Sequence, residues 1–437
     1  MTLTVGFLGY RFMGTAHANA LARLPMFFPD APETHRDVLI GRDEAELAEA
    51  ADRLGFDRYV TDWDPIVEEL DVCYNLAPND LHPEPSIRAL EADTHVLCEK
   101  PLAHTLDAAE RMAAAARESE ATAGVAFNYR FVPAIQYAKR LIDDGFLGDV
   151  HHVRARYLQD WLVDPEAPWS WRNSAAVAGS GALGDLGAHS IDLAQFLLGE
   201  RIDRVSGHLE TFVDERPVDG ETGEATDTRP VTVDDAYTAQ AAFDGGAMGV
   251  FEASRFATGH RNANRIEING SDGSIRFDLE RLNELEVHDA DDRGFETVLV
   301  TDPDDPYVAQ WWPPGHVLGW EHAIVHENCA FLRSASAKES YAPDFADGLQ
   351  VQRVLDGWES TVSDRRQWQC HATDTRSRRG VASYLIVLCR SARSAHLFDS
   401  GSRRGKHRVN CQFSAHIPLH TCWGVKFLSK SVPRERE

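Results

Sequence analysis

The fold of this chain is decided by the stretch LTVGFLGYRFMG, residues 3–14. The apolar run over residues 3–8 predicts a buried strand, and the residues that follow, through Leu24, predict a helix. A strand that enters a helix through a glycine turn is typical of a dinucleotide-binding unit: Gly9 permits the tight turn, and the helix N-terminus receives a pyrophosphate. Arg11 replaces the usual middle glycine, so the pattern alone fits an ordinary structural turn equally well.

A second strand is predicted at residues 37–40, and it leads into Gly41, Arg42 and Asp43. In NAD-binding folds an acidic residue after this strand holds the adenosine ribose. With glycine at that position, Arg42 could hold the 2′-phosphate of NADP, or Asp43 could serve the ribose hydroxyl. A solvated surface charge is an equally good interpretation of Arg42. The sequence leaves the choice between NAD and NADP open.

The mainly apolar run at residues 95–98 predicts a strand, which is followed directly by Glu99, Lys100 and Pro101. Ligands in open α/β sheets gather at the carboxyl ends of the strands, so Lys100 is expected at the mouth of the sheet. Pro101 disfavours helix at Lys100 and favours an extended backbone. Taken alone, the motif also fits an exposed charged loop.

Polar residues follow two neighbouring predicted strands as well. They are Asn79 and His82 after the strand at 71–76, and Asn128 and Tyr129 after the strand at 122–127. The carboxyl ends of parallel strands meet at one edge, so these groups should converge there with Lys100. Convergence of polar groups is what a cofactor pocket needs.

Two further stretches contain candidate site residues. Asp185 and His189 are four residues apart at the start of a predicted helix, so both can face one site, although a structural histidine is the ordinary alternative. Residues 159–172 combine three tryptophans with amide and carboxylate groups. Such a stretch suits sugar binding because rings cover C–H faces while polar groups bind hydroxyls. A packing loop is the alternative for this stretch.

Together these motifs resemble the glucose–fructose oxidoreductase, inositol dehydrogenase and rhizopine catabolism family, Gfo/Idh/MocA, and most closely its levoglucosan dehydrogenase-like branch. The resemblance covers residues 1–368. It is carried by Gly9 to Gly14 with Ala16-His17, Ala77-Pro78-Asn79 with His82, Glu99-Lys100-Pro101, Asn128-Tyr129-Arg130, and the run from Gly184 to Asp192.

The resemblance implies an α/β protein of two domains. Residues 1–128 would form an NAD(P)-binding Rossmann domain with a doubly wound parallel sheet. Residues 129–368 would form an α+β domain for substrate binding and oligomerisation, with an open, mainly antiparallel sheet. The implied activity is NAD(P)-dependent oxidation of a secondary hydroxyl of a sugar, anhydrosugar or cyclitol by hydride transfer to nicotinamide.

The expected catalytic residues are Lys100, His189 and Asp185, which the family pattern places beside the nicotinamide. His189 is expected to titrate near neutral pH and to act as the general base, while Lys100 hydrogen-bonds the reacting oxygen; these two roles are exchangeable. Asp185 is expected to orient His189 or to hold a neighbouring hydroxyl.

The expected binding residues fall into two groups. Those for NAD or NADP are Gly9, Arg11, Phe12, Met13, Gly14, Arg42, Ala77, Pro78, Asn79, His82, Glu99, Lys100, Asn128, Trp171 and Arg172. Those for the substrate are Tyr129, Gln159, Trp161, Asp185 and His189. No metal is expected, because His322 and His326 have helical spacing but no evident third ligand.

Two other readings of the same motifs remain. A related enzyme could reduce a keto-sugar, or use tightly held NAD for redox-neutral glycoside cleavage. A cofactor-sensing regulator would need the nucleotide pocket alone, so the presence of Lys100, Asp185 and His189 argues against it.

Charge divides the chain into two parts. The formal net charge is −25, with +9 on residues 370–437 and −34 on residues 1–369. So acidic a body should repel nucleic acid and anionic membranes, and it resembles the solvated surface of halophilic proteins. The sequence contains no membrane span and no secretion signal, which predicts a cytoplasmic protein. The family resemblance implies a small carbohydrate as substrate and a homodimer or homotetramer.

The basic, cysteine-containing tail at 369–437 lies outside the resemblance. We expect an appended segment that is disordered or foreign to the family, and recruitment of an acidic partner is the functional alternative. The cysteines of the body, Cys73, Cys98 and Cys329, are expected to be reduced core residues.

Overall fold

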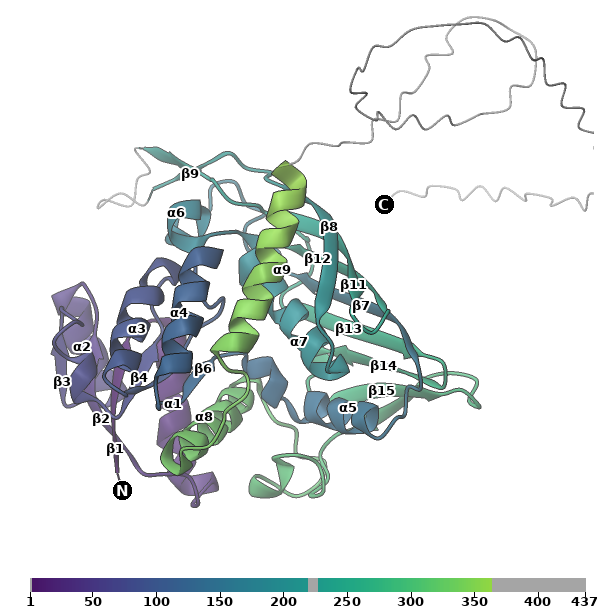
Figure 1. Cartoon of the computed structure of the whole chain (residues 1–437), viewed down its shortest axis with the longest axis horizontal. Helices are drawn as coiled ribbons and strands as arrows, with labels where there is room; N and C mark the ends of the chain where they lie inside the picture. The colour runs from purple at the N-terminus through teal and green to yellow at the C-terminus, as the bar shows by residue number, and fades with distance from the viewer. Residues whose placement is uncertain (1, 219–226, 364–437) are drawn as a thin grey trace, which may run out of the picture. The chain divides into compact units, whose positions relative to one another are not determined.

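The N-terminal half is built around a six-stranded parallel sheet in the order β3-β2-β1-β4-β5-β6 (Figure 1). Its strands are β1 (Leu3–Leu8), β2 (Thr34–Ile40), β3 (Arg58–Val60), β4 (Val72–Asn75), β5 (His95–Cys98) and β6 (Ala123–Val125). Its helices are α1 (Phe12–Phe27), α2 (Glu44–Leu54), α3 (Pro83–Glu91) and α4 (Leu106–Glu118). This is the strand order of a dinucleotide-binding fold, and the expected doubly wound sheet is confirmed.

The second half contains an eight-stranded sheet in the order β16-β15-β14-β13-β7-β12-β11-β8. Its strands are β7 (Val150–Leu158), β8 (Ile202–Glu210), β11 (Ala236–Phe243), β12 (Met248–Ser254), β13 (Ala263–Gly270), β14 (Gly273–Asp278), β15 (Glu284–Asp289) and β16 (Glu296–Leu299), and a small hairpin pairs β9 (Glu215–Pro217) with β10 (Thr228–Pro230). Every neighbouring pair in the large sheet is antiparallel except β7 and β12. The expected open, mainly antiparallel sheet is confirmed.

Helices join the two halves. The second half begins with α5 (Pro133–Asp143), α6 (Ala175–Ala178) and α7 (Ala188–Leu198), and α8 (Trp320–Ala337) and α9 (Phe345–Ser363) come last. Helix α8 packs against α1, whereas α9 packs against both α4 and β8, as Figure 1 shows. The chain therefore returns to the nucleotide-binding half before it ends.

The structure is a computed structural model that describes residues 2–218 and 227–363. The tail predicted at 369–437 therefore lies outside the described residues, together with its cysteines. Cys73, Cys98 and Cys329 are buried free thiols, as expected. No described helix is long and apolar enough to cross a membrane.

A buried ion pair fixes α7 against the segment that follows β6. The Arg130 guanidinium donates from Nε to Asp192 Oδ2 at 2.9 Å and from Nη2 to Asp192 Oδ1 at 2.6 Å. Its Nη1 also lies 3.3 Å from Asp347 Oδ2 on α9. Both Arg130 and Asp192 are buried, so neither charge has water to replace its partner.

We expect Arg130→Met to lower the free energy of unfolding by about 3–5 kcal/mol, because it leaves a buried carboxylate uncompensated. Urea denaturation measures the loss. The double variant Arg130→Met with Asp192→Leu removes both charges and should recover most of it. A loss below about 1 kcal/mol in the single variant would show that Asp192 is not left as an uncompensated anion, because it takes up a proton or is reached by water.

Candidate active site

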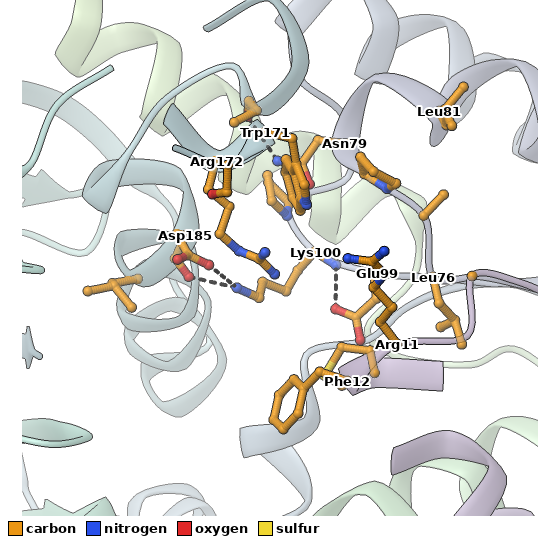
Figure 2. A pocket seen from close by; sticks show the side chains of 18 of the residues that line it. Arg11, Phe12, Leu76, Asn79, Leu81, Glu99, Lys100, Trp171, Arg172 and Asp185 are labelled. Carbon is orange, nitrogen blue, oxygen red and sulfur yellow. Dashed lines mark hydrogen bonds and ion pairs between the residues drawn. The ribbon is translucent and has the colours of Figure 1, made fainter. Parts of the chain in front are cut away.

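A cavity of about 1450 Å³ lies between the nucleotide-binding sheet and the second half. Its walls come from the glycine turn, from the ends of β2, β4 and β5, and from segments of the large sheet. Figure 2 shows Lys100, Glu99 and Asn79 on one side of this pocket and Trp171, Arg172 and Asp185 on the other. The polar rim expected from the sequence therefore faces a second wall of polar and aromatic residues.

The glycine turn fits a bound pyrophosphate. Gly9 has φ +111°, and a Cβ there would lie 2.5 Å from Leu76 O; a Cβ on Gly14 would lie 2.6 Å from Gly9 O. These close approaches exclude larger residues and bring α1 against the turn. No side chain caps the N-terminus of α1, so its first N–H groups are available to an anion. The Arg11 side chain is turned away to Glu46, with Nη2 3.0 Å from Oε2.

Lys100 is held against Asp185. Its Nζ donates to the Asp185 carbonyl oxygen at 2.7 Å and lies 3.2 Å from Asp185 Oδ1 (Figure 2). Asp185 belongs to a π-helical turn, Leu183–Gly187, that leads into α7. Burial by itself would raise the pKa of Asp185, but the positive charges of Lys100, Arg172 and Arg255 lower it to about 2. Asp185 is therefore an anion that balances and directs the lysine.

His189 lies among aromatic rings. Its ring centroid is 4.4 Å from that of Tyr129, 6.1 Å from Tyr157 and 6.2 Å from Phe127. Burial is the largest cause that lowers the pKa of His189 well below its ordinary value, and the positive charge of Lys100 is the second. The expectation that His189 titrates near neutral pH is therefore wrong. The imidazole is a neutral group, and no described hydrogen bond joins it to Asp185.

Most of the expected cofactor residues line the cavity, but two do not. Gly14 acts through the close approach of α1 to the turn. His82 is fully buried, and its ring nitrogens each lie 3.0 Å from a backbone carbonyl oxygen, of Pro101 for Nδ1 and of Ala77 for Nε2. His82 thus ties together two loops that line the pocket, and its expected contact with the cofactor is corrected to this supporting role.

The part of the cavity lined by Tyr129, Tyr157 and Asn262 contains a series of connected hydrogen bonds. Tyr129 Oη lies 2.8 Å from Tyr157 Oη, and Tyr157 Oη donates to Asn262 Oδ1 at 2.7 Å. Gln159 Nε2 donates to the same Asn262 oxygen at 2.8 Å, and Trp161 Nε1 donates to Gln159 Oε1 at 2.9 Å. The three expected substrate residues Tyr129, Gln159 and Trp161 are thus held in one network.

Sequence reasoning missed several residues that line the cavity. These are Tyr157, Arg255, Arg261, Asn262 and Trp320. The alternation of apolar and charged residues from Val153 to Tyr157 could have indicated that Tyr157 lies on the buried face of β7, as the structure shows. Asn262 precedes β13 in an irregular segment, where no periodic pattern indicates the direction of a side chain.

Comparisons with known proteins identify the family of this chain. The NAD-binding Rossmann model of the Gfo/Idh/MocA oxidoreductases matches residues 3–127, and the model of their C-terminal domain matches residues 135–276. Levoglucosan dehydrogenase of Pseudarthrobacter phenanthrenivorans is 41% identical over 370 residues, which cover 81% of this chain and 94% of the relative. This chain belongs to the Gfo/Idh/MocA family. Myo-inositol 2-dehydrogenase of Thermotoga maritima is 28% identical over 67% of this chain and 80% of the relative.

Solved structures show the same relationship. An oxidoreductase domain protein from Kribbella flavida superposes with a TM-score of 0.80 at 50% identity, covering 84% of this chain and 98% of that one. Levoglucosan dehydrogenase in complex with NADH and levoglucosan superposes with a TM-score of 0.79 at 39% identity, covering 83% and 98%. The chain is therefore an NAD-binding oxidoreductase with sugar dehydrogenases among its relatives.

Proposed function

We propose that this protein oxidises a secondary hydroxyl of a sugar or anhydrosugar with NAD(P)+. The observation that carries the proposal is the meeting of Lys100, Asp185 and His189 in one cavity, next to a glycine turn that fits a pyrophosphate. The similarity to levoglucosan dehydrogenase supports a carbohydrate substrate.

The protonation states of Lys100, Asp185 and His189 assign each residue a different role in the reaction. Bound NAD(P)+ would accept the hydride from the alcohol carbon. Lys100, directed by anionic Asp185, donates a hydrogen bond to the substrate hydroxyl oxygen and stabilises the negative charge that develops there. His189 is neutral and can accept the hydroxyl proton, so it suits the role of general base. Tyr129 and Gln159 offer hydroxyl and amide groups to the remaining sugar oxygens.

A screen of sugars and anhydrosugars with NAD+ and NADP+ in high salt tests the proposal. Net formation of reduced nicotinamide, followed by absorbance, is the expected result. Product without net reduction would favour redox-neutral glycoside cleavage, whereas oxidation of NADH by keto-sugars alone would favour a reductase. Cofactor binding without turnover of any carbohydrate would overturn the enzymatic proposal.

The end of β2 favours acceptance of NADP. Gly41 provides no carboxylate at the position where one usually holds the ribose, and a Cβ there would lie 2.4 Å from Tyr10 Cε1, so a larger residue would require the Tyr10 ring to move. Asp43 caps α2, with Oδ1 accepting the Glu46 N–H at 3.0 Å. Arg42 is exposed at the cavity edge and has no hydrogen bond or ion pair to another described residue. Its guanidinium is available to a 2′-phosphate.

We expect Arg42→Ser to raise the KM for NADP+ at least about tenfold and to change that for NAD+ by less than about twofold, because charge-assisted hydrogen bonds to the phosphate are lost. Initial rates at fixed sugar concentration measure both constants. Arg53→Ser, at the other end of α2, is a matched control. Equal changes for the two cofactors would refute a phosphate-binding role.

The oligomer is part of the same proposal. The outward side of β12 exposes Met248 and Val250, with 62% and 52% of their surface accessible, and a second copy of this sheet could cover them. Light scattering should give the mass of a dimer or tetramer, and Val250→Glu should lower it. A monomer in the unmodified protein would refute this part of the proposal.

A further inference from the structure

A row of buried polar side chains, Asn328, His17 and Glu99, leads from α8 to the backbone of Lys100. Asn328 is fully buried, and its Nδ2 donates to Ile324 O at 2.7 Å. This bond fixes the orientation of the amide, because a carbonyl oxygen only accepts. The same Nδ2 lies 2.9 Å from His17 Nδ1. Nδ1 must therefore be the acceptor, which leaves Nε2 as the ring nitrogen that carries a proton.

The Nε2 side of the His17 ring faces Glu99. His17 Nε2 lies 3.5 Å from Glu99 Oε1, within ion-pair distance, and neither atom has a hydrogen-bond partner among the described residues. The other carboxyl oxygen, Glu99 Oε2, accepts the backbone N–H of Lys100 at 3.1 Å (Figure 2). Glu99 thus accepts one hydrogen bond, from Lys100, and its other oxygen faces the His17 ring at 3.5 Å. A carboxylate can accept on both oxygens, whereas an amide of the same shape can accept on only one.

Glu327 precedes Asn328 on α8 and lies near Glu99. Glu327 is fully buried, and neither of its carboxyl oxygens has a described hydrogen-bond partner. Burial and the nearby charge of Glu99 raise the pKa of Glu327 well above its ordinary value. Glu327 is accordingly a neutral acid beside Glu99, and a glutamine there would reproduce its charge and shape.

We propose that His17 and Asn328 are positioning residues for Lys100, acting through the Glu99 carboxylate. Three separate elements contribute to this row of side chains: α8 supplies Asn328, α1 supplies His17, and the end of β5 supplies Glu99. Because α1 also presents its N-terminus to the cofactor, one helix sets both the pyrophosphate site and the backbone of the catalytic lysine. The inference rests on the proposed function for its kinetic consequence, but its geometry is independent of it.

A double-mutant cycle separates positioning from packing. We expect Glu99→Gln and Asn328→Leu each to lower kcat about tenfold, with the Kd for NADH changed less than about threefold. The kcat of the double variant should be no lower than that of Glu99→Gln alone, because both substitutions interrupt the same row of side chains. Losses that multiply to about a hundredfold would show independent effects and overturn the proposal. Glu327→Gln, on the same helix and equally buried, is the control, with kcat unchanged.

Amide hydrogen exchange tests the geometry without turnover. The Lys100 N–H, measured by NMR, should exchange faster in Glu99→Gln and in Asn328→Leu than in the unmodified protein, and at an unchanged rate in Glu327→Gln. Unchanged exchange in Asn328→Leu would overturn the positioning role. Absence of sugar oxidation by the unmodified protein would instead refute the proposed function and leave this measurement valid.

Discussion

Replacing Lys100 by methionine is expected to lower kcat for sugar oxidation by at least about a hundredfold. Methionine keeps much of the aliphatic stem but removes the ammonium group that donates to Asp185 and, in the proposed mechanism, to the reacting oxygen. The negative charge that develops on that oxygen would lose its nearest cation. Steady-state formation of reduced nicotinamide at saturating sugar and cofactor measures the effect.

The same variant should bind NADH with a Kd within about threefold of the unmodified protein, because the glycine turn and α1 carry the pyrophosphate site. Fluorescence titration gives this constant. Lys139→Met, which removes a lysine that pairs with Asp143 on α5, is the matched control and should keep full activity. If kcat of Lys100→Met were unchanged, Lys100 would have no part in catalysis.

The nucleotide-binding half could be predicted because its signals are local. Continuous apolar runs mark buried parallel strands, and Gly9 with Gly14 marks a turn whose close contacts leave no room for a Cβ. Lys100 follows β5 directly, so its place at the edge of the sheet follows from the strand itself. The antiparallel sheet came from the family resemblance together with turn signals between its strands.

The remaining features depend on long-range packing. The environment of His189 is made by rings from β7 and from the segment after β6, so its neutral state could not be inferred from its own helix. His82 resembles a pocket residue in sequence, yet its ring turns inward to two carbonyl groups. The contact between His17 and Asn328 joins positions 311 residues apart, and no local pattern indicates it.

Replacing His189 by asparagine is expected to lower kcat/KM for sugar oxidation by about a hundredfold or more, since the proposed general base is removed. The pH profile of the unmodified protein gives the sharper test. A base must be unprotonated, so the rate falls as the pH falls through its pKa. Because burial and Lys100 place the pKa of His189 well below its ordinary value of 6.5, the acidic limb of kcat/KM should lie below pH 6.5.

The acidic limb should also depend on Asp185. Its negative charge raises the pKa of His189, opposing burial and Lys100, so Asp185→Asn should move the limb to still lower pH while slowing the reaction through a less well-directed lysine. A limb at or above pH 6.5 in the unmodified protein, or one that persists unchanged in His189→Asn, would assign the proton transfer to another group. Lys100 would then be the first candidate for the base, with the two roles exchanged.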